Sequence, residues 1–288
     1  MSTPPLLLRL RSLRGDLKPA LARIADLILS DPAGVASMTI GDLAREADCS
    51  EASVVRFARQ LGFRGYRDLR FRLHEEAVAA ATAGEDHSSD GDIDPSDDIA
   101  TMTGKIAAAD SRAVHDTVRG LDLEALTRVA DAVAPARRIV LFGVGASGLA
   151  ATDEQQKLAR LGLPAVVHTE AHNGLPAVAL LDSDDVLIAF SHSGRTAELL
   201  DATRIAREAG VRVVAVTGAA GSPLAKAADD VLLTAAVESE LRSGATASRI
   251  AQLTVVDCIF VAVATRVPDL GREALRRTRA AVDDRRVH

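Results

Sequence analysis

The amino-acid sequence predicts an all-α N-terminal head joined to an α/β domain whose parallel five-stranded sheet carries helices on both faces. The chain of 288 residues is about twice as long as a typical domain. Up to residue 80 the apolar residues recur at helical spacing, whereas short strand-like runs alternate with helical segments after residue 99. A polar, acidic segment separates the two parts. We therefore place the domains at 1–80 and 99–288, with a flexible linker at 81–98.

The composition predicts aliphatic cores. Hydrophobic residues make up 48% of the chain and aromatic residues only 2%, so Leu, Val, Ile and Ala must fill the interior. Cys49 and Cys258 match no metal or redox spacing, and we expect them to be reduced thiols of a cytoplasmic protein. Arg9 and Arg11 follow the first apolar residues, which is not the order found in a signal peptide. The longest apolar run, 254–264, is too short to span a bilayer, so we expect a soluble protein with no membrane partner.

Charge is distributed unevenly along the chain. The formal net charge of −6, taken alone, argues against a nucleic-acid partner. Residues 1–74 nevertheless carry 12 Lys and Arg against 8 Asp and Glu, while residues 75–98 carry nine acids and no base. The head is therefore basic, and the acidic linker hides this in the average.

The head is predicted to consist of short helices. Residues 17–29 place aliphatic side chains on one helical face, and Asp31-Pro32 ends this helix. Three further helices are predicted, at 40–47, 51–61 and 66–80, with a turn at 48–50 and a stop at Gly62. The small Ala44 allows two of these helices to approach closely.

The helices at 40–47 and 51–61 form a helix-turn-helix pattern. Ser50 is a suitable N-cap for the second helix, whose first residues would enter the major groove of double-stranded DNA. There Arg56 can pair bidentately with guanine, and Ser53 can reach a base edge or a phosphate. The expected DNA-contacting residues are Ser50, Ser53, Arg56, Arg59, Arg64 and Tyr66, the last two through phosphates. The alternative is a helical interaction domain with solvated arginines.

Beyond the linker the pattern is that of a sheet wound on both faces. Five strands are expected, at 138–142, 165–168, 186–190, 211–216 and 231–234. Helices are expected at 99–118, 122–134, 148–161, 172–180, 196–209, 222–228, 247–265 and 271–282. Because strands alternate with helices, the sheet should be parallel and covered on both sides.

A hydroxyl-rich turn follows the strand at 186–190. It contains Ser191, His192, Ser193, Gly194 and Thr196, and a helix begins directly after it. Backbone N–H groups at a helix N-terminus attract anions, and a glycine lets the backbone curl around them. Neither a Lys nor an evident Mg²⁺ ligand accompanies the turn, so it fits a phosphomonoester without a metal or cofactor. The alternative is a cluster that only caps the helix, for which one serine would suffice.

A second turn, at 143–148, matches the pattern G-x-G-x-x-G, and the acidic residue Glu170 follows the next strand. This combination is found in dinucleotide-binding folds. The hydroxyl-rich turn has no role in dinucleotide binding, so we keep such binding as an alternative only.

Taken together, these stretches resemble the MurR/RpiR family of bacterial transcriptional regulators over about 17–74 and 99–265. The resemblance rests on 39–47 and 50–66 in the head, and on IVLFGVGASG, FSHSGRT, SPLAKAADDVLLT and ELRSGATASRIAQLTVVD in the second domain. It implies a helix-turn-helix domain followed by a sugar isomerase (SIS) domain that pairs the subunits into a homodimer or homotetramer. It also implies that the phosphate of a phosphorylated sugar effector is held by Ser147, Ser191, Ser193 and Thr196. The chain departs from the family at Ser53, where a threonine is common, and in its unusually acidic linker.

Two more residues are candidates for contact with the sugar itself. His168 and Glu238 lie at the carboxyl ends of strands, where such sheets bind their ligands. His168 and His172 also have a metal-ligand spacing, but His168 ends a strand, so no metal is expected. Arg242 and Arg249 would contact either the sugar phosphate or the neighbouring subunit, and we favour the subunit contact.

The sequence therefore favours a DNA-binding regulator, not an enzyme, that responds to a sugar phosphate and recognises a palindromic operator. One alternative is a sugar-phosphate isomerase with an accessory head, because SIS domains also occur in isomerases. Another is a sugar-phosphate binder that acts on a protein partner. Aldose–ketose isomerisation needs a positioned base, for which His168, His192 and Glu238 are the candidates.

Overall fold

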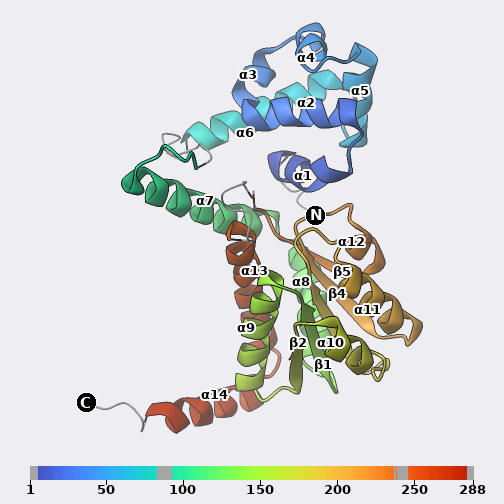
Figure 1. Cartoon of the computed structure of the whole chain (residues 1–288), viewed down its shortest axis with the longest axis vertical. Helices are drawn as coiled ribbons and strands as arrows, with labels where there is room; N and C mark the ends of the chain where they lie inside the picture. Colours follow the sequence, from blue (N-terminus) through green and yellow to red (C-terminus); the bar gives the residue numbers. More distant parts are fainter. Residues whose placement is uncertain (1–5, 83–92, 237, 239–245, 284–288) are drawn as a thin grey trace. The chain divides into compact units, whose positions relative to one another are not determined.

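The computed structural model describes residues 6–82, 93–236, 238 and 246–283, and it divides into two compact units, Met1–Lys105 and Ile106–His288 (Figure 1). Each unit has a hydrophobic core of its own. The division falls inside helix α7 (Ile99–Gly120), a few residues after the expected start of the second domain.

The first unit contains more helices than the sequence predicted. The expected ones are α2 (Pro19–Ser30), α4 (Ile40–Glu46), α5 (Glu51–Gln60) and α6 (Tyr66–Thr82). The structure adds α1 (Leu6–Leu13), a 3-10 turn (Arg14–Asp16) and α3 (Pro32–Ser37). Asp31-Pro32 ends α2 as predicted, but it also starts α3, because the Asp31 carboxylate accepts the Gly34 N–H at 2.8 Å and proline fits the first helical turn.

The predicted linker is ordered where the structure describes it. Residues 83–92 lie outside the described part of the chain, α6 continues to Thr82, and 93–98 form a turn before α7. In this turn the Asp97 carboxylate accepts the Lys105 ammonium at 2.7 Å, and the Asp98 carboxylate accepts the Thr101 N–H at 2.7 Å. These acidic residues therefore stabilise the N-terminus of α7, where the helix dipole favours negative charge.

The second unit is built on a five-stranded parallel sheet, as the sequence predicted. Its strands are β1 (Ile139–Gly143), β2 (Ala165–His168), β3 (Val186–Phe190), β4 (Arg212–Thr217) and β5 (Asp230–Leu233), in the spatial order β2-β1-β3-β4-β5. All four neighbouring pairs are parallel.

Helices cover both faces of this sheet. Alternate strand residues such as Leu141 and Ile188 share a core with α8 (Leu123–Val133), α9 (Ala146–Arg160) and α13 (Ala247–Ala264). The intervening residues, such as Phe142 and Leu187, share a second core with α10 (Ala171–Val178), α11 (Ala197–Glu208) and α12 (Pro223–Ala227). A last helix, α14 (Pro268–Asp283), follows α13. This alternation is the period of two expected for strands that are buried on both sides.

Helix α13 is, within the described residues, the one helix long and apolar enough to cross a membrane by length and composition. Its buried residues, Val255 and Ile259 among them, belong to the core shared with α8 and α9. The apolar composition of α13 is therefore explained by its packing against other helices of the same unit.

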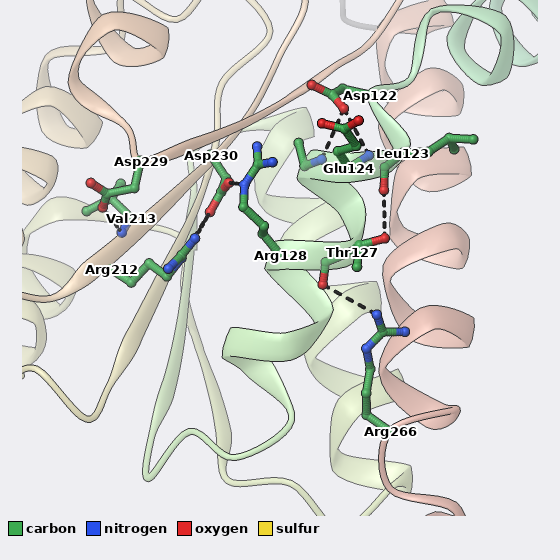
Figure 2. A network of polar contacts seen from close by, with 11 residues as sticks. Asp122, Leu123, Glu124, Thr127, Arg128, Arg212, Val213, Asp229, Asp230 and Arg266 are labelled. Atoms are coloured by element: carbon green, nitrogen blue, oxygen red, sulfur yellow. Dashed lines mark hydrogen bonds and ion pairs between the residues drawn. The ribbon is translucent and has the colours of Figure 1, made fainter. Parts of the chain in front are cut away.

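Ion pairs hold the amino edge of the sheet, away from the strand ends discussed below. The buried Asp230 carboxylate, at the start of β5, accepts Arg128 of α8 at 2.7 Å and Arg212 of β4 at 2.7 Å (Figure 2). The neighbouring Asp229 carboxylate accepts the Val213 N–H at 2.8 Å. Both arginines remain partly exposed, so the buried carboxylate is paired without burying two cations.

Candidate functional site

The order of the strands brings two turns together. The chain moves from β1 to β2 on one side and then crosses to β3 on the other side of β1, so β1 and β3 form the point where the winding reverses. In register, Gly143 at the end of β1 lies opposite Phe190 at the end of β3. The turns that follow, at 144–147 and 191–196, therefore leave the carboxyl edge of the sheet side by side, which is where open α/β sheets bind ligands.

The turn after β3 is held by its own hydroxyl groups. Ser191 is buried, and its Oγ accepts the Gly194 N–H at 3.1 Å and lies 2.9 Å from Thr196 Oγ1. Gly194 has a φ of +61°, and a Cβ at this position would lie 2.1 Å from Ser222 Oγ. Only glycine fits here, because the backbone turns tightly and packs against Ser222. Ser193, the residue before Gly194, is exposed.

The turn after β1 presents Ser147 on the first turn of α9. Gly143 packs against this turn so closely that a Cβ on it would lie 2.6 Å from the Ser147 carbonyl oxygen, and Gly145 has a φ of +62°. The Ser147 hydroxyl accepts a hydrogen bond at 3.1 Å from the Nε2 of Gln252, a buried residue of α13. The glycines of the G-x-G-x-x-G pattern, for which dinucleotide binding was kept only as an alternative, thus shape the turn that carries Ser147.

His192 and Glu238 lie near each other beside these turns. Burial lowers the pKa of His192, and the charge of Glu238 partly offsets this, so the imidazole is neutral at pH 7. Glu238 Oε1 accepts the Ser248 N–H at 2.9 Å. Within the described part of the chain, His192 Nδ1 and Glu238 Oε2 are buried without a hydrogen-bond partner. A buried acceptor in this condition is costly unless a ligand or water completes it.

His168 lies at the same edge of the sheet, in register with Phe142 of β1. It ends β2, burial lowers its pKa, and it makes no hydrogen bond with the serines among the described residues. Arg249 has a buried Nε without a partner in the described chain, and Arg242 lies outside the described residues. Gln252 and Ser248 were not among the residues predicted from the sequence. Their signal was their place in ATASRIAQL (245–253), as polar residues in a segment that is otherwise predicted to be a mainly apolar helix.

The helix-turn-helix of the head is defined by its caps. The Ser50 hydroxyl accepts the Ser53 N–H at 3.2 Å and so begins α5, as predicted. The turn itself is fixed by a residue that the sequence analysis did not select, because Arg23 of α2 donates to the carbonyl oxygens of Ala47 at 2.8 Å and Asp48 at 2.6 Å. Ala44 is buried, which allows close approach.

The predicted DNA-contacting residues differ in exposure. Arg56 and Arg59 are exposed on α5 and, within the described chain, have no charged partner, whereas Arg64 is exposed but pairs with Asp68 at 2.8 Å. The prediction that Tyr66 contacts a DNA phosphate is wrong. It is buried, and its hydroxyl lies within hydrogen-bond distance of the carbonyl oxygens of Val35 at 3.3 Å and Met38 at 3.0 Å. Its phenol anchors α6 to α3, and this role leaves it unavailable to a DNA phosphate.

Metal-binding groups are not found in the described residues: no three His, Cys, Asp or Glu side chains gather in a way that could hold an ion. Cys49 and Cys258 are both free thiols.

Known proteins resemble the chain in both units. The helix-turn-helix domain of the rpiR family matches residues 5–80, and the SIS domain matches residues 132–262. An HTH-type transcriptional regulator of Caldanaerobacter subterraneus subsp. tengcongensis is 37% identical over 257 residues, which cover 89% of each chain.

Two solved structures agree with this. The Vibrio vulnificus NanR protein complexed with ManNAc-6P is 30% identical, covers 98% of this chain and 100% of that chain, and has a TM-score of 0.61. The sugar isomerase domain of an RpiR transcription factor from Sphaerobacter thermophilus is 26% identical, covers 62% of this chain and 98% of that chain, and has a TM-score of 0.57. The chain therefore belongs to the RpiR family of HTH-type transcriptional regulators, which join a helix-turn-helix domain to a SIS domain.

Proposed function

We propose that this regulator binds a palindromic operator through α5 and changes its affinity for that operator when a phosphorylated sugar occupies the β1/β3 switch point. The observation that carries the proposal is the convergence of two turns with hydroxyl groups, one carrying Ser147 and the other Ser191, Ser193 and Thr196, at the carboxyl edge of a parallel sheet.

The chemistry of this edge suits a phosphomonoester. Hydroxyl groups and the free N–H groups at the starts of α9 and α11 all donate hydrogen bonds, and a phosphate offers only acceptors at neutral pH when it is fully ionised. Gly194 keeps the backbone close to the anion. His192 belongs to the same turn, between Ser191 and Ser193. NanR, which resembles this chain over nearly its whole length, is complexed with ManNAc-6P, and this supports a phosphorylated sugar as the class of ligand.

The sugar moiety would extend toward Glu238. Its Oε2 needs a donor, which a sugar hydroxyl supplies, whereas His168 would contribute only from the edge strand. The DNA-contacting set becomes Ser50, Ser53, Arg56, Arg59 and Arg64. We further propose a cytoplasmic homodimer or homotetramer, paired through SIS domains, without catalytic activity.

The proposal is tested by thermal unfolding of the whole chain with a panel of sugar phosphates. A ligand at 100 times its Kd stabilises the folded state by about 2.7 kcal/mol, which raises the melting temperature of the SIS unit by several degrees. The double variant Ser191→Ala with Ser193→Ala should abolish this shift, because the anion loses two hydroxyl donors. Ser183→Ala, an exposed serine before β3, is the matched control and should keep the full shift.

A shift that survives in the double variant would place the phosphate elsewhere, in the first instance at the turn that carries Ser147. Unphosphorylated sugars should give no shift in any of the proteins.

Isomerase activity is the second candidate, and the proximity of His192 to Glu238 is the observation in its favour. We expect the sugar phosphate to be recovered unchanged after long incubation, because Glu238 is bonded to the backbone of α13 and His192 Nδ1 has, among the described residues, no partner that would relay a proton. If NMR showed aldose–ketose conversion at enzyme-like rates, the proposal of a regulator without catalytic activity would be wrong and the protein would be an isomerase.

A further inference from the structure

Gln252 is a polar side chain in the buried face of α13, where its neighbours are aliphatic. It is 1% exposed, and its Nε2 donates to Ser147 Oγ, 105 residues away in the chain, at 3.1 Å. One turn earlier on the same helix, the Ser248 N–H donates to Glu238 Oε1 at 2.9 Å. A single helix thus contacts both the hydroxyl at the phosphate end of the site and the carboxylate at the sugar end.

We propose that Gln252 is a positioning residue that prepares Ser147 for the phosphate of the effector, an inference that rests on the proposed function. A serine hydroxyl has one hydrogen to donate and two lone pairs to accept with. Because the Gln252 amide occupies one lone pair with its N–H, the Ser147 hydrogen has no reason to point back at the amide. It is directed away, where an anion with only acceptor atoms can use it.

Burial makes this arrangement rigid. A buried amide that loses its hydrogen-bond partner destabilises the fold, so the amide and the serine hold each other in one geometry before the ligand arrives. A donor that is already oriented does not lose rotational freedom on binding, which increases affinity without a new ligand contact.

The test is a double-mutant cycle on the whole chain, titrated calorimetrically with ManNAc-6P and with inorganic phosphate. We expect Gln252→Leu to weaken binding about tenfold, the size of effect that one neutral hydrogen bond of ordinary strength supplies. Since Gln252 acts through Ser147, the double variant Ser147→Ala with Gln252→Leu should bind no more weakly than Ser147→Ala alone. Gln252→Met has a similar length but no hydrogen to donate, and it should weaken binding by about as much as leucine does.

Melting of each ligand-free variant checks folding, and Gln252→Met, whose flexible side chain fills a similar volume, provides the comparison if leucine perturbs the core. An unchanged Kd in Gln252→Leu, or effects of the two substitutions that multiply, would overturn the positioning role. A wild-type chain that binds no phosphorylated sugar of the panel would instead overturn the proposed function itself.

Helix α7 carries a second, independent observation. It is 22 residues long, yet its buried residues in the second unit are only Ala113 and Thr117. The Thr117 hydroxyl accepts the Ala235 N–H at 3.0 Å and donates to the Ala235 carbonyl oxygen at 3.4 Å. A side chain that bonds both backbone groups of one residue fixes this end of α7 to the segment between β5 and Glu238.

The same segment is bonded back to the phosphate turn. The Thr234 N–H donates to the Thr217 carbonyl oxygen at 2.9 Å, and the Thr217 hydroxyl donates to the His192 carbonyl oxygen at 3.2 Å. A continuous series of hydrogen bonds therefore runs from the turn after β3 to α7, which continues in sequence toward the head.

The geometry points to Thr117 as the residue that transmits occupancy of the effector site to α7. Thr117→Val keeps the shape of the side chain and removes its hydroxyl, whereas Thr117→Ser keeps the hydroxyl. Thr103→Val makes the same change at an exposed position of the same helix and is the matched control.

Operator affinity is measured by fluorescence anisotropy with and without saturating ManNAc-6P, beside calorimetric titration of the ligand. In Thr117→Val we expect the Kd for the operator without ligand and the Kd for the ligand without operator to stay within about twofold of wild type. The operator affinity with ligand should approach the value without ligand, so that the ratio of the two falls toward one. Thr117→Ser and Thr103→Val should keep the wild-type ratio. A wild-type ratio in Thr117→Val would overturn this role, and a ratio of one in the wild type would overturn the proposed regulation.

Discussion

Glu154 of α9 is a carboxyl group enclosed by protein. It is 0% exposed, and in the described chain neither of its oxygens has a hydrogen-bond partner. Burial raises its pKa well above the ordinary value, and the positive charge of Lys157 offsets only part of this, since Lys157 pairs with Asp153 at 2.5 Å and Asp257 at 2.6 Å. The carboxyl group is thus better tolerated when it is neutral.

This predicts a pH dependence of stability. The pKa of Glu154 is higher in the folded than in the unfolded state, so its contribution is most favourable below the unfolded value of about 4.3 and is lost as the pH rises through the folded pKa. Glu154→Gln cannot ionise, and it should remove this slope and exceed wild type in free energy of unfolding by about 1–3 kcal/mol at alkaline pH. Urea unfolding from pH 5 to 9 measures it, with the exposed Glu208→Gln as control. Parallel curves for wild type and Glu154→Gln would show that the carboxyl group is solvated.

Single residues of this kind were the hardest to predict from the sequence. Glu154 lies in DEQQK, which reads as a solvated helix face, and Gln252 lies in an apolar run. Whether a polar side chain is buried depends on which helix packs against it, here α9 against α13, and the spacing of residues along one helix does not contain this information. Tyr66 failed for the same reason, because α3, the helix to which it is bonded, was not expected.

At the scale of elements, residues that cap or end a helix predicted where individual helices begin and end. The limits of α5 were expected because Ser50 and Gly62 mark them, whereas the capping residue Thr39 at the start of α4 was found only in the structure. The short helices α1 and α3 were not predicted, since so few residues do not form a visible periodicity. The bounds of the strands were predicted to within about one residue.

Arg56 provides the prediction at this scale, because it tests α5 as the recognition helix. Arg56→Ala should weaken operator binding by about 1–3 kcal/mol and relax specificity at one base pair, since a bidentate contact to guanine is lost. Arg56→Lys keeps the charge without the planar fork, and it should relax the specificity while keeping the salt dependence of binding. Gln60→Ala, on the exposed end of the same helix, should change neither. Footprinting and anisotropy on the native promoter measure this, and an unchanged footprint in Arg56→Ala would rule out α5.

At the scale of the whole molecule, the sequence predicted a parallel sheet but not the order of its strands. The site depends on that order, because Ser147 and Ser191 meet only if β1 lies beside β3. The alternation of strands and helices predicts that the strands run parallel. Which strand lies beside which depends on side-chain packing between segments far apart in the chain. The grouping of Ser147 with Ser191, Ser193 and Thr196 came from the family resemblance, and it stays a proposal.

The division into two units leads to the last prediction. Residues 1–82 have their own core, so this fragment should fold alone, provided that it keeps the end of α6. A cut after His74 would remove Glu76, whose carboxylate accepts the Leu6 N–H at 2.6 Å and the Leu7 N–H at 3.2 Å and thereby holds α1.

The fragment lacks the SIS domains that we propose to pair the subunits, so it should bind each half of a palindrome separately. Linked heads bind with avidity, and we expect the fragment to lose a factor of about 10²–10⁴ in operator affinity relative to the whole chain. Fusing it to a dimeric coiled coil through a flexible linker should restore much of this factor, which separates lost pairing from lost folding. Anisotropy on operator and half-operator DNA measures both proteins. Full affinity of the monomeric fragment would show that a single head carries the binding and that the second unit serves the effector alone.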